Sequence, residues 1–389
     1  MASIMVHPAT LRWAVSQSGA DPAAVARKEG LSDFPQWLNA VDPFSLSFSK
    51  LTALGSALQM PFGALVRSVV PEAHEDELIR YRTIDNHAVD ASRNLKDTIA
   101  IMRNRQNWAH DEMLAQGFGN NLLVGSVSSR ATADEMALRL REGLSLDAGW
   151  CRHKRNAERF RFLREKASDA GLMVMVDSKA GTSNARRLDV REFRAFVLLD
   201  DVAPLIFINR NDSYAAMLFS LLHEIGHVLL GTNEVYNDLF LTADDGEIER
   251  RINQAVVLSV VDDDAEFREY WEKIATGGAS VCEIANDCAK RYGLSALALT
   301  IHAHRLGIVG DKAVNLVRAA SDVRVIGAKA GSGGDQNLTN ASHLDTRFVR
   351  MIRDGVDRGS LPYSDGLTLL GVKSMHAYDG LLKAKGLDQ

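Results

Sequence analysis

Two histidines and a glutamate in the segment His223–His227 have a spacing suited to metal chemistry. The segment reads H-E-x-x-H, with Glu224 directly after His223. On a helix, residues four apart lie one turn above each other, so both imidazoles can direct a nitrogen at one ion. Zinc accepts nitrogen and carboxylate ligands in a tetrahedron. Glu224 would project toward the water at such a site and take its proton, the general-base role in a metalloprotease.

The predicted helix that carries this motif is apolar on almost every side. Asp212 can cap its start, and Gly231 is a suitable residue for its end. A helix with this pattern is buried, which places two imidazoles and a carboxylate away from solvent. A shared metal ion gives all three a partner, whereas the alternative is that core hydrogen bonds satisfy the histidines. The apolar flanking residues are Leu221, Leu222, Ile225, Val228, Leu229 and Leu230.

A third protein ligand is expected downstream, because a catalytic zinc keeps three protein ligands and one open position. Helical offsets from Glu249 give an apolar stripe that includes Ile252 and Val256, while those from Glu247 give a polar one. A carboxylate on a buried stripe is costly unless it is paired. We therefore predict Glu249 as the third ligand, with an ion pair to an arginine as the alternative. The acidic residues considered are Glu234, Asp238, Asp244, Asp245, Glu247 and Glu249.

The segments before the motif predict an α+β fold with a small sheet. Short runs rich in β-branched and other apolar residues occur at Leu172–Val176, Ala195–Leu199 and Pro204–Ile208. Helical patterns precede them at Thr132–Leu144 and Phe160–Ala170. Together these elements predict a sheet placed directly before the helix that carries the histidines.

Three polar segments receive structural interpretations. The basic segment Cys151–Lys166 is expected to form a solvated helix face over an apolar stripe, in preference to a nucleic-acid site. Val261–Glu266 lacks the ligand order of a calcium loop and is expected to end a helix. Gly327–Asp335 is glycine-rich but lacks the order of a phosphate-binding loop, so we expect a flexible loop.

The organisation of the chain predicts four parts. Apolar residues recur at helical spacing in Leu11–Ala14 and in Phe48–Leu58, which indicates a module of short helices. The predicted parts are this module (1–70), a connecting helix (71–120) that begins with the charged stretch Pro71–Arg82, a metallopeptidase domain (121–275) and a helical C-terminal region (276–389).

The composition is that of an ordinary globular chain. It has 389 residues, 46% hydrophobic and 24% charged, which argues against a disordered or collagenous protein. The 45 basic and 50 acidic residues give a net charge of -5, so no global attraction to nucleic acid or membrane is expected. Three cysteines without a CxxC pair, and no visible leader or membrane-spanning segment, predict a cytoplasmic protein.

These residues, in this order, resemble the ImmA/IrrE family of zinc metallopeptidases, in which a helix with HE-x-x-H precedes one with E-x-x-x-N. Glu192–Asp212 resembles the two strands before the family's active helix, and Leu11–Ala14 with Trp37 resembles an XRE-type helix-turn-helix module. The resemblance implies a gluzincin-like core with helical modules on both sides. The matching residues are His223, Glu224, His227, Glu249 and Asn253, and the segments Gly333–Asp335 and Leu369–Lys373 resemble the longer members.

The chain also departs from the family pattern. Ile252 and Val256 stand where many relatives have Cys and Ala, and no proline follows the helix; we expect packing changes that spare the ligands. An arginine expected near the end of the helix after Ser295 is replaced by His302, which leaves the transition-state donor open. The candidates for stabilising the oxyanion are His302, His304, Arg305 and Tyr236.

The resemblance implies a zinc-dependent endopeptidase with a protein substrate, often a helix-turn-helix repressor, in toxin-antitoxin, mobile-element or stress regulation. An extended substrate could add to the edge of the predicted sheet. The alternative is a DNA-binding regulator or antitoxin-like module whose metal domain is sensory or structural. Against it, Ser32–Pro43, which corresponds to the recognition helix, contains two aspartates and two prolines but no lysine or arginine.

Overall fold

The computed structural model describes residues 3–18, 21–58, 65–66, 68, 92–152, 154–183, 185–231, 243–322 and 341–388. The chain separates into two compact units, Met1–Asp76 with Val89–Asp97 and Glu77–Ala88 with Thr98–Gln389. Several residues named from the sequence lie outside the described residues: Pro71–Arg82, Glu234, Tyr236, Asp238 and Gly327–Asp335. No helix in the described ranges is long and apolar enough to cross a membrane.

The first unit combines short helices with a two-stranded antiparallel sheet. Strand β1 (Ser3–Val6) pairs with β2 (Phe44–Ser47), and the buried side chains of Val6 and Leu46 join the core of the unit. That core also contains Leu11, Leu51 and Leu54, as the helical spacing predicts. The helices are α1 (Pro8–Ser18), α2 (Pro22–Ala26), α3 (Phe34–Asn39) and α4 (Phe48–Leu58).

Two expectations for this unit are corrected by the structure. A purely helical module was wrong, because β1 and β2 are strands of four residues each, too short to show a clear alternation in the sequence. Phe48 does not join the apolar stripe; it is 60% exposed at the first position of α4. The helix-turn-helix character of this unit and its binding to DNA stay predictions.

The sheet of the second unit has three strands, and all three lie within one residue of their predicted places. They are β3 (Met173–Asp177), β4 (Ala195–Leu198) and β5 (Leu205–Asn209). The order is β3-β5-β4, with β5 parallel to β3 and antiparallel to β4. Nearly every strand residue is buried, because both faces of the sheet are covered. This arrangement confirms an α+β fold.

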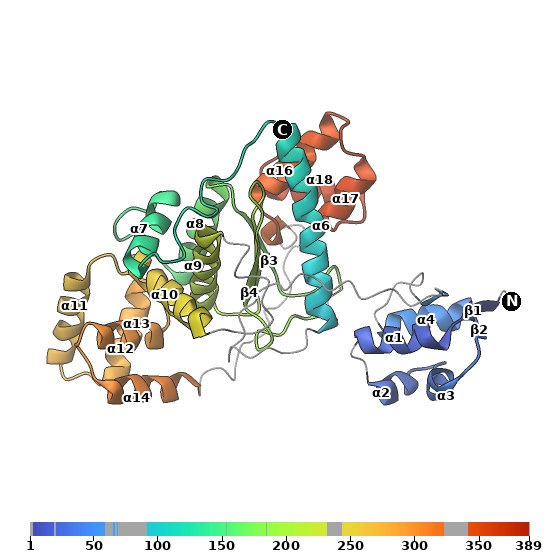
Figure 1. The fold of residues 1–389 in the computed structure, drawn as a ribbon, viewed down its shortest axis with the longest axis horizontal. Coiled ribbons are helices and arrows are strands. Elements are labelled where there is room, and N and C mark those ends of the chain that lie inside the picture. The colour runs from blue at the N-terminus through green and yellow to red at the C-terminus, as the bar shows by residue number, and fades with distance from the viewer. Residues whose placement is uncertain are drawn as a thin grey trace. The chain divides into compact units, whose positions relative to one another are not determined.

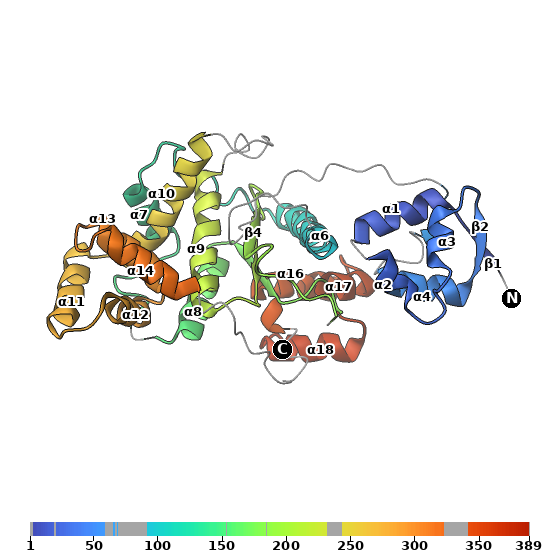
Figure 2. The same cartoon turned by 90° about the horizontal axis from the view of Figure 1, so that it is seen from below.

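Alternate strand residues face two different layers of helices. Ile206 and Ile208 share a core with α8 (Asn156–Asp169) and α9 (Tyr214–Leu230) on one face. On the other face, Phe207 stacks on Phe196 at 5.1 Å between ring centroids. Figures 1 and 2 show α6 (Arg93–Ala115) and α16 (Thr346–Asp357) on this second side, with α17 (Tyr363–Leu370) and α18 (Met375–Ala384).

The helix that carries the histidines begins one residue later than predicted. Ser213, and not Asp212, is the N-cap of α9, since its hydroxyl accepts a hydrogen bond from the Ala216 N–H. Asp212 forms an ion pair with Arg194 at 2.8 Å instead. The predicted end is confirmed, because Gly231 adopts a left-handed conformation (φ 49°) and closes the last turn.

Helices that precede and follow α9 in the chain complete the second unit. One core cluster joins Leu222 on α9 with Trp271, Ile284 and Leu299 from the later helices, so residues on both sides of the predicted boundary at 275/276 pack together. The helices are α7 (Ala133–Gly143), α10 (Ala243–Val260), α11 (Asp264–Thr276), α12 (Val281–Tyr292), α13 (Ala296–Arg305) and α14 (Asp311–Asp322).

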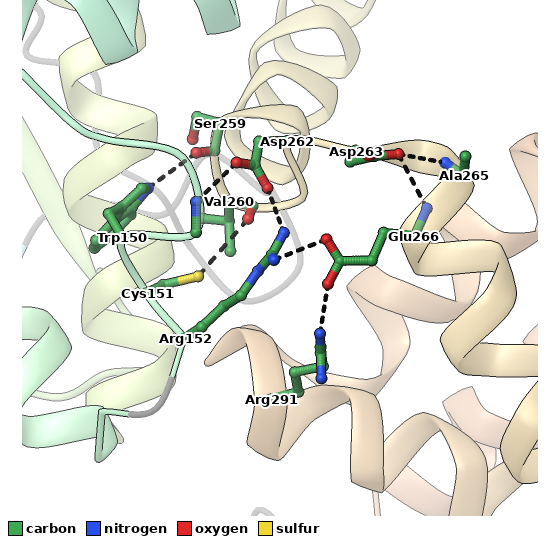
Figure 3. Close-up of polar contacts among 11 residues, drawn as sticks. Trp150, Cys151, Arg152, Ser259, Val260, Asp262, Asp263, Ala265, Glu266 and Arg291 are labelled. Carbon is green, nitrogen blue, oxygen red and sulfur yellow. Dashed lines mark hydrogen bonds and ion pairs between the residues drawn. The ribbon is translucent and has the colours of Figure 1, made fainter.

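A network of ion pairs joins the loop before α8 to the α10–α11 connection and to helices α11 and α12 (Figure 3). Arg152 contacts Asp262 at 2.8 Å and Glu266 at 2.7 Å, and Glu266 also pairs with Arg291 on α12. The Gly149 N–H donates to the second Asp262 oxygen. The polar segment Val261–Glu266 therefore ends α10, as predicted, and also holds the loop and α12 in place.

The thiols in this region are free and differ in accessibility. Cys151 and Cys288 are buried, which raises the pKa of Cys151 to about 11 and that of Cys288 to about 12, while Cys282 is half-buried. Because the thiolate is the reactive form, we expect a disulfide reagent at pH 8 to label Cys282 rapidly in the native protein and the other two only after denaturation. Rapid labelling of all three thiols in the folded protein would contradict this expectation.

Two arginines of α8 overturn the prediction of a purely solvated basic face. Arg159 is 2% exposed and donates to the carbonyl oxygens of Cys151, Lys290 and Arg291. The last two belong to the final turn of α12, whose carbonyls lack partners within the helix. Arg164 donates to the carbonyl oxygens of Val174 and Ser342. These guanidinium groups join distant segments, because one planar group can satisfy several carbonyls.

We expect Arg159→Met to destabilise the protein by about 2–3 kcal/mol, because it removes charged hydrogen bonds and leaves buried carbonyls without donors. The measurement is urea unfolding, in which the midpoint falls at an unchanged slope. The exposed Arg161 on the same helix provides the matched control, Arg161→Met, which should lie within about 0.5 kcal/mol of the wild type. Equal midpoints for the two variants would contradict the role assigned to Arg159.

Candidate metal centre

The helical spacing of the motif brings two imidazole nitrogens together on α9. His223 and His227 are buried, with exposed fractions of 3% and 6%, and their Nε2 atoms lie 3.1 Å apart. Phe219, one turn before His223, stacks on its ring at 6.3 Å between centroids. The side chains are therefore held by packing, and the two nitrogens face a common point.

Glu249 on α10 supplies a carboxylate at the same point. Its oxygens lie 3.2 Å from Nε2 of His223 and 3.4 Å from Nε2 of His227. Glu247 is exposed, in agreement with the expected difference between the two glutamates. The next residues of the Glu249 stripe, Ile252 and Val256, are buried. The side chains of Asp244 and Asp245, like Glu234 and Asp238, lie outside the described residues.

Asn253 determines which nitrogen of His223 carries the proton. Its Oδ1 atom lies 3.1 Å from Nδ1 of His223, so Nδ1 donates and neutral His223 presents a lone pair at Nε2. That lone pair faces a carboxylate oxygen and the second imidazole. A cation bound at this point could accept the lone pairs of all three groups, and a hydrogen-bonded imidazole is the usual form of a metal-binding histidine.

The separations between the donor atoms fit a small tetrahedral cation. Ligands placed 2.0–2.1 Å from zinc at tetrahedral angles lie about 3.3–3.4 Å apart. The two histidine nitrogens lie 3.1 Å apart, one Glu249 oxygen lies 3.2 Å from His223 and the other lies 3.4 Å from His227, all close to that value. The cluster, whose ligand atoms all lie within 4.8 Å of one another, contains two nitrogens and one carboxylate, a donor set that zinc accepts.

The comparison with known families agrees with this geometry. Residues 167–304 match the peptidase M78 family model, described as an IrrE N-terminal-like domain. The match begins in α8, ends in α13 and includes His223, His227 and Glu249. Residues 167–304 are thus similar to an IrrE N-terminal-like domain of peptidase family M78, and we call this matched segment the peptidase domain. No curated protein and no solved structure matches the chain.

Gly226 allows α10 to approach α9 in the peptidase domain. A Cβ atom at this position would lie 2.7 Å from Cγ2 of Ile252, which is fully buried. Ile252 follows Glu249 by one helical turn, so the same close approach places the carboxylate near the histidines. The sequence pattern gave no role to Gly226. A glycine inside a buried helix costs stability, and this cost indicates a close approach by a neighbouring element.

We expect Gly226→Ala to destabilise the peptidase domain by about 1–3 kcal/mol, because overpacking outweighs the better helix propensity of alanine. The measurement is a double-mutant cycle in urea with Ile252→Ala, which removes Cγ2. The loss of unfolding free energy in the double variant should be smaller than the sum of the losses in the two single variants. Gly246 on α10 has open space around it, so Gly246→Ala serves as the control and should not lower stability. Additive losses in the cycle would contradict the assigned contact.

Glu224 is 2% exposed on α9 of the peptidase domain, directly after His223.

The described candidates for the oxyanion donor are engaged elsewhere. His302 contacts Asp264 at 2.8 Å, and Arg305 lies 3.6 Å from the same carboxylate. His304 pairs with Asp311 at 3.1 Å. Because these groups have partners on α11 and α14, no contact in the described structure joins them to the histidine pair, and Tyr236 lies outside the described residues.

Proposed function

We propose that the peptidase domain is a zinc-dependent endopeptidase in which His223, His227 and Glu249 hold the metal. The observation that carries the proposal is the convergence of two imidazole nitrogens and a carboxylate, the ligand types of zinc, at separations that suit it. These three residues would fill three positions of a tetrahedral site, and a catalytic zinc keeps the fourth position for water. When bound, zinc polarises the scissile carbonyl and lowers the pKa of water.

We assign the proton transfers to Glu224. It lies next to His223 in the sequence and on the same buried helix, so a carboxylate is available beside the proposed metal position. An ionised carboxylate accepts the proton of the attacking water and passes it to the leaving nitrogen of the substrate. His223 itself is unsuited to this task, because Asn253 binds one ring nitrogen and Glu249 faces the other.

The substrate that we propose is a protein, bound in an extended form and belonging to a regulatory pathway, such as a helix-turn-helix repressor. The topology supports the extended form. The strand order places β4 at an edge of the described sheet, and β4 packs against α9, which carries the histidines. A peptide that adds to this edge would run beside the proposed metal position, with main-chain hydrogen bonds as its main contacts.

The experiment that tests the proposed function uses Glu224→Gln as a trap. The variant, expressed in its native host, should retain a partner protein that the wild type cleaves and releases. Purified wild-type protein with zinc is then expected to cut that partner at one internal bond, and a chelator should stop the reaction. The proposal fails if the captured partner remains intact with zinc-loaded wild type, or if cleavage continues in the presence of the chelator.

A further inference from the structure

A cavity of about 560 Å³ lies on the face of the sheet opposite the histidines. Met175 and Phe207 line it, whereas the neighbouring residues Val174 and Ile206 point to the core shared with α9. The other walls come from α6 and from the segment between α17 and α18, which Figures 1 and 2 place on this side of the sheet. The cavity is therefore separate from the candidate metal centre.

The charged side chains of this cavity have an excess of positive charge. Arg105, Lys179 and Lys373 line it, together with the single carboxylate of Asp177. The two oxygens of that carboxylate already have partners. One lies 3.2 Å from Nδ1 of His343, and the other accepts hydrogen bonds from the main-chain N–H groups of Ser178 and Lys179. The lining therefore holds three cations and one carboxylate, whose two oxygens are hydrogen-bonded or paired within the protein.

Arg105 is the cation that lies deepest in the wall. Burial lowers its pKa to about 10, although Asp177 acts in the opposite direction, so the group remains charged at neutral pH. Its Nε donates to the carbonyl of Leu369 at 2.8 Å, and Nη1 lies 3.9 Å from the sulfur of Met102. No carboxylate among the described residues forms an ion pair with it. Asp177 offsets only part of the cost of desolvating the guanidinium, and an anionic ligand beside Arg105 would offset more of it.

We propose that this cavity binds a small organic anion, with its acidic group against Arg105 and its apolar body against Met175 and Phe207. The volume lies within the range of about 300–1,000 Å³ that is common for small-molecule sites. Lys373 is exposed at the segment after α17 and adds a second cation at the wall. The combination of an apolar floor with a few cations selects an aromatic or aliphatic acid over a neutral compound or a cation.

The test measures binding of 1-anilinonaphthalene-8-sulfonate, an aromatic anion, by its fluorescence with the full-length protein. We expect saturable binding that benzyl phosphate reverses and benzyl alcohol at the same concentration does not. Arg105→Met should weaken dye binding by about tenfold or more. Ala377→Leu, which fills the cavity from α18 and leaves every charge in place, should weaken it similarly. Arg350→Met, a change at an exposed arginine of α16 away from the cavity, should leave it unchanged.

Thermal melts of each variant show whether it is folded at the temperature of the titration. If Arg105→Met is unfolded there, Ala377→Leu and Lys373→Gln decide the outcome, because neither removes a main-chain contact. The proposal is overturned if the wild type shows no saturable binding at millimolar concentrations, if benzyl alcohol displaces the dye as well as benzyl phosphate does, or if the folded cavity variants bind like the wild type. Dye binding should also persist after treatment with a chelator, since this site does not depend on the proposed metal.

Discussion

A Glu224→Gln protein is expected to keep its zinc and to cleave its substrate about 10²- to 10⁴-fold more slowly than the wild type, because general-base catalysis contributes rate factors of that size. The amide of glutamine has almost the same shape as the carboxylate but does not accept a proton at neutral pH. The groups that we propose as metal ligands, His223, His227 and Glu249, are untouched by the change. The loss should therefore appear in the rate of the chemical step alone.

The measurement combines three quantities for the same preparation: the cleavage rate of the captured partner, the zinc content per chain and the thermal midpoint. Glu247→Gln, which changes an exposed glutamate on α10, is the control and should cleave at the wild-type rate. A Glu224→Gln protein that contains zinc and cleaves at the wild-type rate would show that Glu224 is not the base. A variant that loses zinc together with activity would place Glu224 among the groups that hold the metal.

Replacement of Glu249 is expected to act on metal affinity. Removing one ligand of a zinc site, whose total binding free energy is roughly 10–16 kcal/mol in structural sites, should weaken zinc binding by about 100- to 1,000-fold. The two glutamates of α10 allow a sharp comparison, because Glu249 contacts both histidines and Glu247 is exposed on the same helix. Glu249→Ala should show the loss, and Glu247→Ala should bind zinc as the wild type does.

Competition with a chromogenic chelator measures these affinities. A second measurement is the rise in melting temperature on addition of zinc, which reports binding to the folded state and should disappear in Glu249→Ala. Equal zinc affinities for the two variants would contradict the assignment of Glu249 as a ligand. If neither the wild type nor the variants bind zinc, the cluster is held by a proton between the imidazoles and the carboxylate, and the proposed hydrolase function fails with it.

The candidate centre was largely predictable because its geometry is local. A spacing of four residues puts His223 and His227 on one helix face whatever the rest of the chain does. The apolar stripe of α10 likewise distinguished Glu249 from Glu247, since burial on a helix follows its period. The strands β3, β4 and β5 were placed within one residue for a similar reason, because each is a short apolar run between turns, whereas β1 and β2 were missed.

Other features depended on which segments became neighbours. The sequence of α8 predicts a solvated basic face. In the structure Arg159 is buried and donates hydrogen bonds to carbonyl oxygens more than 130 residues away in the chain. Asp212 has the chemistry of a cap but pairs with Arg194 across a turn, which left the cap to Ser213. A side chain with several possible partners takes the one that the fold brings closest, and residue type alone does not specify that partner.

By itself, the sequence determined the three strands before α9, the pair of histidines and the glutamate that faces them, because repeating backbone geometry turns spacing into direction. Only the tertiary structure decided how closely α9 and α10 approach at Gly226, and which cations line the cavity behind the sheet. Both depend on contacts between segments distant in the chain. Such contacts arise from the packing of complementary surfaces, and the hydrophobic period of a single helix or strand does not specify which element packs against it.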